Sequence, residues 1–194
     1  MTAAHDPNHR KASAGAAGSA FGVLDECHRQ TLAAIADLET IVSRLETGSV
    51  DAQTRALAAD VVRHFSTTAR QHHEDEELHV FPKLATSGDA AMKQAILRLQ
   101  EDHHWIEEDW MELLPHLDAV ACGQTWYDVA LLHEGAEIFA ALSRDHIALE
   151  ETCLYPEARA RTGAAEELAM GREMAARRRA TRRAATGDRP RSHP

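Results

Sequence analysis

The chain has few cysteines, few prolines and no long apolar run, and each shortage excludes a class of protein. The three cysteines are an odd number with no CxxC pair, which favours a reducing, cytoplasmic setting over a disulfide framework. The N-terminus has no apolar signal-peptide region, and no run approaches about 18 apolar residues, so we expect neither secretion nor a membrane span. Six prolines, abundant alanine and the absence of strand-type alternation favour an all-α fold.

Basic charge is also scarce over most of the chain. Residues 21–162 carry 11 Lys/Arg against 26 Asp/Glu, whereas residues 163–194 carry eight Arg against four acidic residues. An acidic body argues against nucleic acid as the main partner. The basic end can attract nucleic acid, membrane phosphates or the acidic body, but a solvated helix end is the interpretation that we favour.

Two segments repeat one pattern in the same register, 74 residues apart. They read HHEDEELHVFP, from His72 to Pro82, and HIALEETCLYP, from His146 to Pro156. Each contains His, three residues, Glu-Glu, two residues, an aliphatic residue, an aromatic residue and Pro. A His and a Glu four positions apart lie on one face of a helix. Each segment therefore offers two metal ligands, His72 with Glu76 and His146 with Glu150.

The repeat extends to two further histidines. His28 and His103 lie 75 residues apart, and each follows an acidic cluster and an aliphatic residue. The chain is thus a duplicated helix pair, in which a helix with one His is followed by a helix with HxxxE.

Apolar residues at steps of three and four predict four long helices and a fifth, shorter one. The expected spans are 20–46, 50–84, the segment from the Ser87–Asp89 turn to Gly123, the segment from the Thr125 cap past Glu150, and 164–184. Gly48 and Gly123 are expected to end helices, and Ser49 or Asp51 to cap the second. Such short loops make neighbouring helices antiparallel, so we expect an up-down-up-down four-helix bundle.

The expected domain organisation has three parts. Residues 1–19 are predicted to be a disordered tail, 20–161 the four-helix bundle, and 162–194 a basic C-terminal helix and tail. When the four helices are laid antiparallel, the six His and Glu groups fall within a slab of roughly 10 Å. Independent surface pairs would have no reason to agree in height, so this agreement indicates a metal site.

Four imidazoles and two carboxylates are too many for one tetrahedral zinc ion. They suit two metal ions, each bound by two His, with Glu76 and Glu150 bridging. Imidazole and carboxylate without thiolate indicate iron first, with manganese or zinc as substitutes. A metal-free bundle with a polar layer is the alternative, but its buried ionisable groups would be hard to satisfy.

Other residues have two interpretations each. Glu107 lies one turn from His103 and is either a seventh ligand or part of a surface ion pair. His73 either turns inward beside His72 or lies on an exposed flank. His79 and Cys153, at equivalent repeat positions, either line a channel or pack in the core.

The order His28, His72-x3-Glu76, His103, His146-x3-Glu150, with its two EExx(V/L)(F/Y)P echoes, resembles the hemerythrin-like HHE cation-binding domain family over residues 20–160. The resemblance implies a non-haem di-iron centre that meets O2, NO or peroxide. Oxygen-carrying hemerythrins have HxxxH on the third helix and HxxxxD on the fourth. Here these positions read His103-x3-Glu107 and HxxxE, which argues against reversible oxygen carriage.

Three classes of function remain open. The first is a metal-binding protein of the stress-response type that binds, senses or scavenges O2 or NO, or holds iron. The second is a di-iron enzyme, such as a ferroxidase, a peroxidase or an iron–sulfur cluster repair protein. The third is a structural or regulatory bundle whose basic tail engages a partner. Turnover separates the first two, metal content separates both from the third, and the sequence does not predict the oligomeric state.

Overall fold

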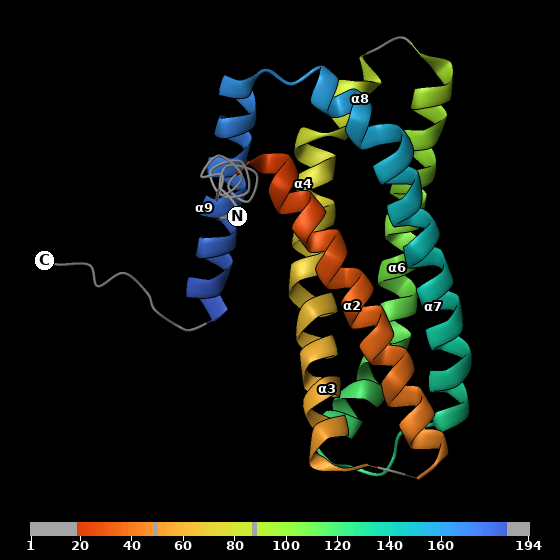
Figure 1. The fold of residues 1–194 in the computed structure, drawn as a ribbon. Coiled ribbons are helices and arrows are strands. Elements are labelled where there is room, and N and C mark those ends of the chain that lie inside the picture. The colour runs from red at the N-terminus through yellow and green to blue at the C-terminus, as the bar shows by residue number, and fades with distance from the viewer. Residues whose placement is uncertain (1–18, 49, 87–88, 186–194) are drawn as a thin grey trace, which may run out of the picture. The chain divides into compact units, whose positions relative to one another are not determined.

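The computed structural model describes residues 19–48, 50–86 and 89–185, and every regular element in these ranges is a helix (Figure 1). The predicted Ser49 cap, the Ser87-Gly88 turn and nearly all of the predicted disordered tail lie outside the described residues. The elements are α2 (Ala20–Glu46), α3 (Ala52–Arg63), η1 (His64–Ala69), α4 (Arg70–His79), α5 (Phe81–Ala85), α6 (Ala90–Ala121), α7 (Val129–Leu149), η2 (Glu150–Leu154), α8 (Tyr155–Ala160) and α9 (Ala164–Ala185).

The chain divides into two compact units. One contains residues 27–158, and the other contains residues 1–26 together with 159–194. The predicted domain boundaries at 19/20 and 161/162 stay a prediction.

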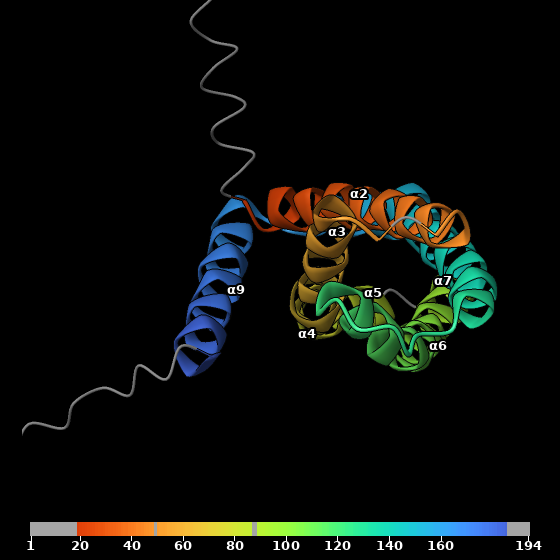
Figure 2. The same cartoon turned by 90° about the horizontal axis from the view of Figure 1, so that it is seen from below.

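The unit of residues 27–158 is the predicted up-down-up-down four-helix bundle. Its four rods are α2 from Cys27 onward, the run from α3 through η1 to α4, α6, and α7 with η2 (Figure 1). Seen end-on, the rods surround one interior (Figure 2). The all-α fold class and the bundle are therefore confirmed.

Local capping explains where the helices begin and end. The Asp51 carboxylate accepts a hydrogen bond from the Thr54 amide at 2.7 Å and caps α3. Gly48 and Gly123 follow α2 and α6 with φ angles of 75° and 69°, a backbone conformation that glycine adopts without strain. The predicted Thr125 cap is wrong, because Asp128 caps α7 by accepting from the Ala130 and Leu131 amides.

The predicted inward faces are largely confirmed. Steps of three and four along residues 20–46 predict an inward face of eight positions, and all eight are buried: Phe21, Leu24, His28, Thr31, Ile35, Leu38, Val42 and Leu45. Three aromatic rings form the part of the core nearest the histidines. Phe65 lies 5.1 Å from Trp110 and 4.8 Å from Phe139, measured between ring centroids. Aliphatic side chains fill the bundle from there to the loops at Gly48 and Gly123.

Two π-helical segments interrupt the long rods, and neither was predicted. η1 precedes the His72 segment, and η2 begins at Glu150 itself. A π turn contains an extra residue, so it rotates the following side chains relative to an α-helix. The prediction that Cys153 faces inward is wrong for this reason, because Leu154 is buried in its place and Cys153 is exposed.

The second unit contains the predicted fifth helix, which runs as α9 from Ala164 to Ala185. Within this unit the Arg159 guanidinium pairs with Asp25 and lies 5.2 Å from the centroid of the Phe21 ring. Among the described residues, none of the helices has the length and apolar character needed to cross a bilayer.

Candidate metal centre

The six residues of the repeated pattern meet in the interior of the bundle. His28 comes from α2, His72 and Glu76 from α4, His103 from α6, His146 from α7 and Glu150 from the first position of η2. All six side chains are buried, with His103 the most accessible at 5 %. The fold thus brings together residues that are more than 120 positions apart, at the common height that the helix lengths predict.

The two glutamates lie at the centre of the cluster. Glu76 Oε2 is 3.4 Å from His72 Nε2 and 3.5 Å from His103 Nε2. Glu150 Oε2 is 3.1 Å from His28 Nε2, and Glu150 Oε1 is 3.2 Å from His146 Nε2. Each carboxylate therefore lies between a histidine of its own rod and a histidine of another. Carboxylates placed in this way can bridge two cations.

Two overlapping sets of donor atoms follow from this arrangement. One set contains His28 and His72, the other contains His103 and His146, and both contain Glu76 and Glu150. Within each set the donor atoms lie within 4.8 Å of one another. Each set could hold a metal ion, and because it contains no thiolate its donors suit hard or intermediate cations.

The cluster contains buried polar atoms that lack a hydrogen bond, which is the strongest indication that it fits metal ions. In the described part of the chain these atoms include His72 Nε2, Glu76 Oε2, His103 Nε2, His146 Nε2 and both Glu150 oxygens. Buried polar atoms are nearly always paired in folded proteins, and leaving one unpaired costs about 1–3 kcal/mol. Cations between the Nε2 atoms and the carboxylates would satisfy all of these atoms together.

The charges of the cluster also fit bound cations. Burial and the charge of Glu150 raise the pKa of Glu76 to about 7. Burial lowers the pKa of His146, but the charge of Glu150 and the nearby Asp102 carboxylate outweigh that effect and raise the pKa to about 10. Burial lowers the pKa of His72 and of His73. Without metal the cluster must retain protons to limit its buried charge, and bound cations would displace them.

Two further carboxylates hold the outer nitrogens of the histidines. His28 Nδ1 lies 3.0 Å from Glu151 Oε1, and His103 Nδ1 lies 2.9 Å from Glu77 Oε1. Since an ionised carboxylate only accepts hydrogen bonds, Nδ1 donates and Nε2 is left as the donor atom for a metal. Sequence reasoning missed this role, although the signal was present as the second Glu of each Glu-Glu pair.

Tyr155 is a third residue whose role sequence reasoning missed. Its hydroxyl donates a hydrogen bond to Glu76 Oε1 at 2.5 Å and lies 3.2 Å from His28 Nε2. Its ring stacks on His28 with centroids 5.1 Å apart, as Phe81 stacks on His103 at 5.5 Å. The signal was the aromatic residue before each Pro, which is a phenol in only one of the two segments.

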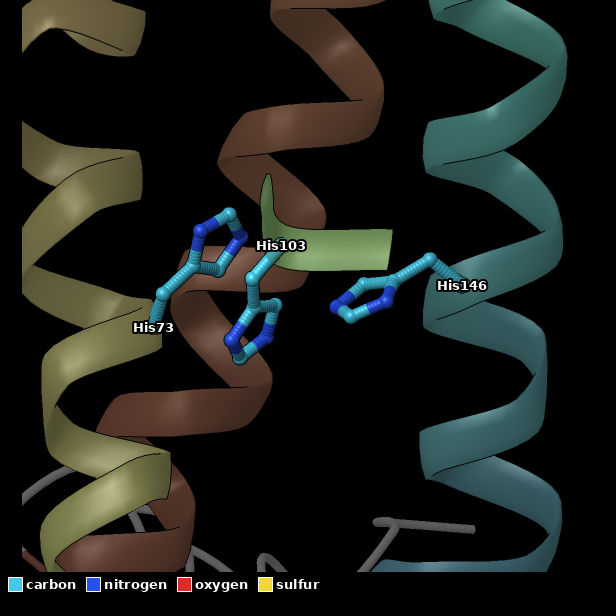
Figure 3. A group of neighbouring side chains, drawn as sticks. All are labelled: His73, His103 and His146. Carbon is cyan, nitrogen blue, oxygen red and sulfur yellow. The ribbon is translucent and has the colours of Figure 1, made fainter. Parts of the chain in front are cut away.

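The structure separates the two additional candidates, Glu107 and His73. Among the described residues, Glu107 is exposed and its carboxylate lies 3.4 Å from Arg70 Nε, so the structure does not bring it to the cluster. His73 turns inward instead, and its donor atom lies within 4.8 Å of those of His103 and His146. Figure 3 shows the three imidazoles converging from α4, α6 and α7.

A small cavity lies beside the cluster on the side of the aromatic core. It has a volume of about 20 Å³, which is enough for one water-sized molecule. Four ring side chains of the cluster, His28, His72, His73 and His146, form one wall. The remaining lining residues are Thr31, Phe65, Ala69, Ile106, Ser143 and Ile147.

Comparison with known proteins agrees with this geometry. Residues 19–158 match the model of the hemerythrin HHE cation-binding domain. The chain is also 33% identical, over 129 residues, to an uncharacterised protein of Haemophilus influenzae (strain ATCC 51907 / DSM 11121 / KW20 / Rd), an alignment that covers 64% of this chain and 72% of that protein. The family match spans the whole bundle and every residue of the cluster. The chain therefore belongs to the hemerythrin HHE cation-binding family.

Proposed function

We propose that the bundle holds two iron ions and that the resulting centre binds, senses or scavenges O2 or NO, or holds iron. The observation that carries this proposal is the pair of four-donor sets that share Glu76 and Glu150. Manganese and zinc fit the same donors and are expected as substitutes. The ions would supply a redox-active centre with positions open to small ligands.

The protein's own residues position and insulate this centre. Glu76 and Glu150, both fully buried, would offset the charge of bound cations. Glu151 and Glu77 fix the rings of His28 and His103 so that both Nε2 atoms face inward. Tyr155 holds Glu76 Oε1 and offers a proton donor within the buried cluster.

The adjoining cavity is suited to a diatomic molecule. Phe65, Ile106 and Ile147 give it apolar walls, which favour an uncharged gas over an ion. Ser143 Oγ is buried in this lining and makes no hydrogen bond among the described residues, so it is available to a bound ligand. Thr31, by contrast, is held by His64, with 2.9 Å between Oγ1 and Nε2.

The experiment is anaerobic loading of the metal-free protein with ferrous iron, desalting, and mixing with O2 or with NO while the absorbance is recorded. We expect O2 to oxidise the bound iron within minutes, without recovery when O2 is removed, and NO to change the spectrum reversibly. Glu150→Ala, which removes a shared donor, is the control for iron bound elsewhere.

The outcomes separate the possible roles. Repeated release of intact O2 on deoxygenation would contradict the sensor and scavenger interpretation. Iron uptake without reaction with either gas would leave iron holding as the role. Sustained turnover with peroxide or ferrous iron would favour the enzyme alternative, which the phenol of Tyr155 beside Glu76 makes worth testing.

A further inference from the structure

His73 belongs to the interior of the bundle, although it follows His72 directly in the sequence. Its ring stacks on His103 with a centroid distance of 4.0 Å and an interplanar angle of 11°. It lies 5.6 Å from the ring of His146, again between centroids. Figure 3 shows that the ring approaches the other two from α4, opposite α7.

The geometry of α4 explains how two consecutive histidines can serve one cluster. Glu76 lies four positions after His72 and three positions after His73, so it is a same-face neighbour of both. The rings of His72 and His73 diverge from each other, with centroids 5.9 Å apart. His72 shares a donor set with His28, whereas His73 shares one with His103 and His146.

Stacking alone does not account for His73. A ring that served only to pack against His103 could be apolar, and the equivalent position of the second repeat, Ile147, is apolar and buried. Yet His73 places Nδ1 in the interior, where it makes no hydrogen bond in the described part of the protein. Buried imidazole nitrogens are normally paired, so this atom requires a partner of another kind.

We propose that His73 is a ligand of the metal ion bound by His103 and His146. This inference rests on the two-ion centre proposed above and deepens it. The ion on the His103 side would draw on two overlapping groups of donors, His73 with His103 and His146, and the latter two with Glu76 and Glu150. The ion on the His28 side would draw on one group of four. The two ions would therefore be inequivalent, and the one on the His28 side would keep more positions for an external ligand.

The inequivalence makes a prediction about loading. An additional imidazole strengthens binding of divalent transition metals, so the His103 side fills first and the His28 side second. The asymmetry originates in the sequence, because the repeat carries His at position 73 and Ile at position 147.

Cobalt(II) is the probe for the test, because it is stable in air and shifts the proton signals of its imidazole ligands. The metal-free protein is titrated with cobalt(II), and binding is followed by calorimetry and by proton NMR. The NMR titration is run in H2O and repeated in D2O, because the exchangeable ring N–H signals of bound histidines disappear in D2O. His73→Phe keeps a ring stacked on His103 and removes both nitrogens. His104→Phe is the matched control, since His104 is exposed and lies near Glu108.

We expect the parent and His104→Phe to bind two ions in two steps. His73→Phe should lose one exchangeable shifted N–H signal. It should also bind one of the two ions at least about ten-fold more weakly, because loss of a group that only hydrogen-bonds to a ligand already costs that much. Full affinity and an unchanged set of signals in His73→Phe would overturn the inference and leave His73 a packing residue.

Failure of the two proposals is distinguishable. A parent that binds one ion, with an N–H signal lost in His73→Phe, would contradict the two-ion centre and retain His73 as a ligand. If the parent binds two ions and His73→Phe changes neither the affinity nor the N–H signals, the two-ion centre stands and His73 is not a ligand. If circular dichroism shows that His73→Phe does not fold, the same two measurements on the smaller His73→Asn decide.

Discussion

Tyr155 and Phe81 occupy equivalent positions in the two repeated segments, and each stacks against the lone histidine of the other half, Tyr155 on His28 and Phe81 on His103. The equivalence ends at the hydroxyl, because Tyr155 reaches Glu76 Oε1 at 2.5 Å and Phe81 has no polar atom to offer. The two halves thus supply similar donors with different surroundings, so the centre is asymmetric even before His73 is considered.

Tyr155→Phe should weaken metal binding without unfolding the bundle. The substitution keeps the ring stacked on His28 and removes the hydrogen bond to Glu76. Loss of an outer partner of a ligand typically costs about 10–100-fold in metal affinity. Competition with a chelator measures this change, and Tyr127→Phe, outside the cluster, is the control. Equal affinities for the two variants would show that the hydroxyl does not support Glu76.

The outer carboxylates Glu77 and Glu151 should contribute similarly to metal affinity, each to the affinity for one of the two ions. Glu77→Gln and Glu151→Gln each keep the side-chain shape and weaken the hydrogen bond to Nδ1 of His103 or His28. We expect each to lower the affinity for one ion by about 10–100-fold, and the double variant to show the two losses independently. Two-step metal titration measures both. If one variant weakened both ions equally, the assignment of each carboxylate to one side would fail.

The sequence predicts the helices and their buried faces well, but it predicts the orientation of individual side chains less well. Apolar periodicity predicts the bundle and the buried face of α2, because burial of one face is a property of the whole helix. The six His and Glu residues of the repeat lie at equal heights along the four antiparallel helices, and this predicts that their side chains meet. The π turn at Glu150 is not predictable from periodicity, so the outward turn of Cys153 was missed. The orientation of His73 and Glu107, each near the edge of an inward face, depends on tertiary packing that sequence spacing does not resolve.

His64 should make the metal-free protein sensitive to acid. Burial lowers the pKa of His64 from its ordinary 6.5 to about 4. Between these values the unfolded chain binds more protons than the folded one, so the unfolding free energy falls as the pH falls through this window and levels off below about 4. The full effect is up to about 3 kcal/mol.

The measurement is urea unfolding of the metal-free protein at pH 7 and pH 4, for the parent and for His64→Gln. The advantage of the parent over the variant should shrink by up to about 3 kcal/mol at the lower pH. Other titrating groups are common to both proteins and cancel in the difference. His133→Gln, at an exposed site, is the control. If the difference in unfolding free energy between the parent and His64→Gln does not change with pH, the prediction is wrong.

Removal of residues 163–194 should leave metal binding intact, because every residue of the cluster lies between His28 and Tyr155. A chain ending at Thr162 is expected to retain the helical circular dichroism of the bundle and similar affinity for iron. A large loss of metal from this shortened chain would show that α9 is required to form the site, and the predicted boundary at 161/162 would then be wrong.

The central claim is that Glu76 and Glu150 are shared by two metal ions, and metal analysis tests it most directly. After anaerobic loading with ferrous iron and desalting, the parent should retain close to two equivalents of iron per chain, and Glu76→Ala and Glu150→Ala should each lose most of it. Glu101→Ala, an exposed glutamate of α6, should retain as much iron as the parent. A parent that retains one equivalent or less, or Glu76→Ala and Glu150→Ala variants that retain as much iron as Glu101→Ala, would contradict the account.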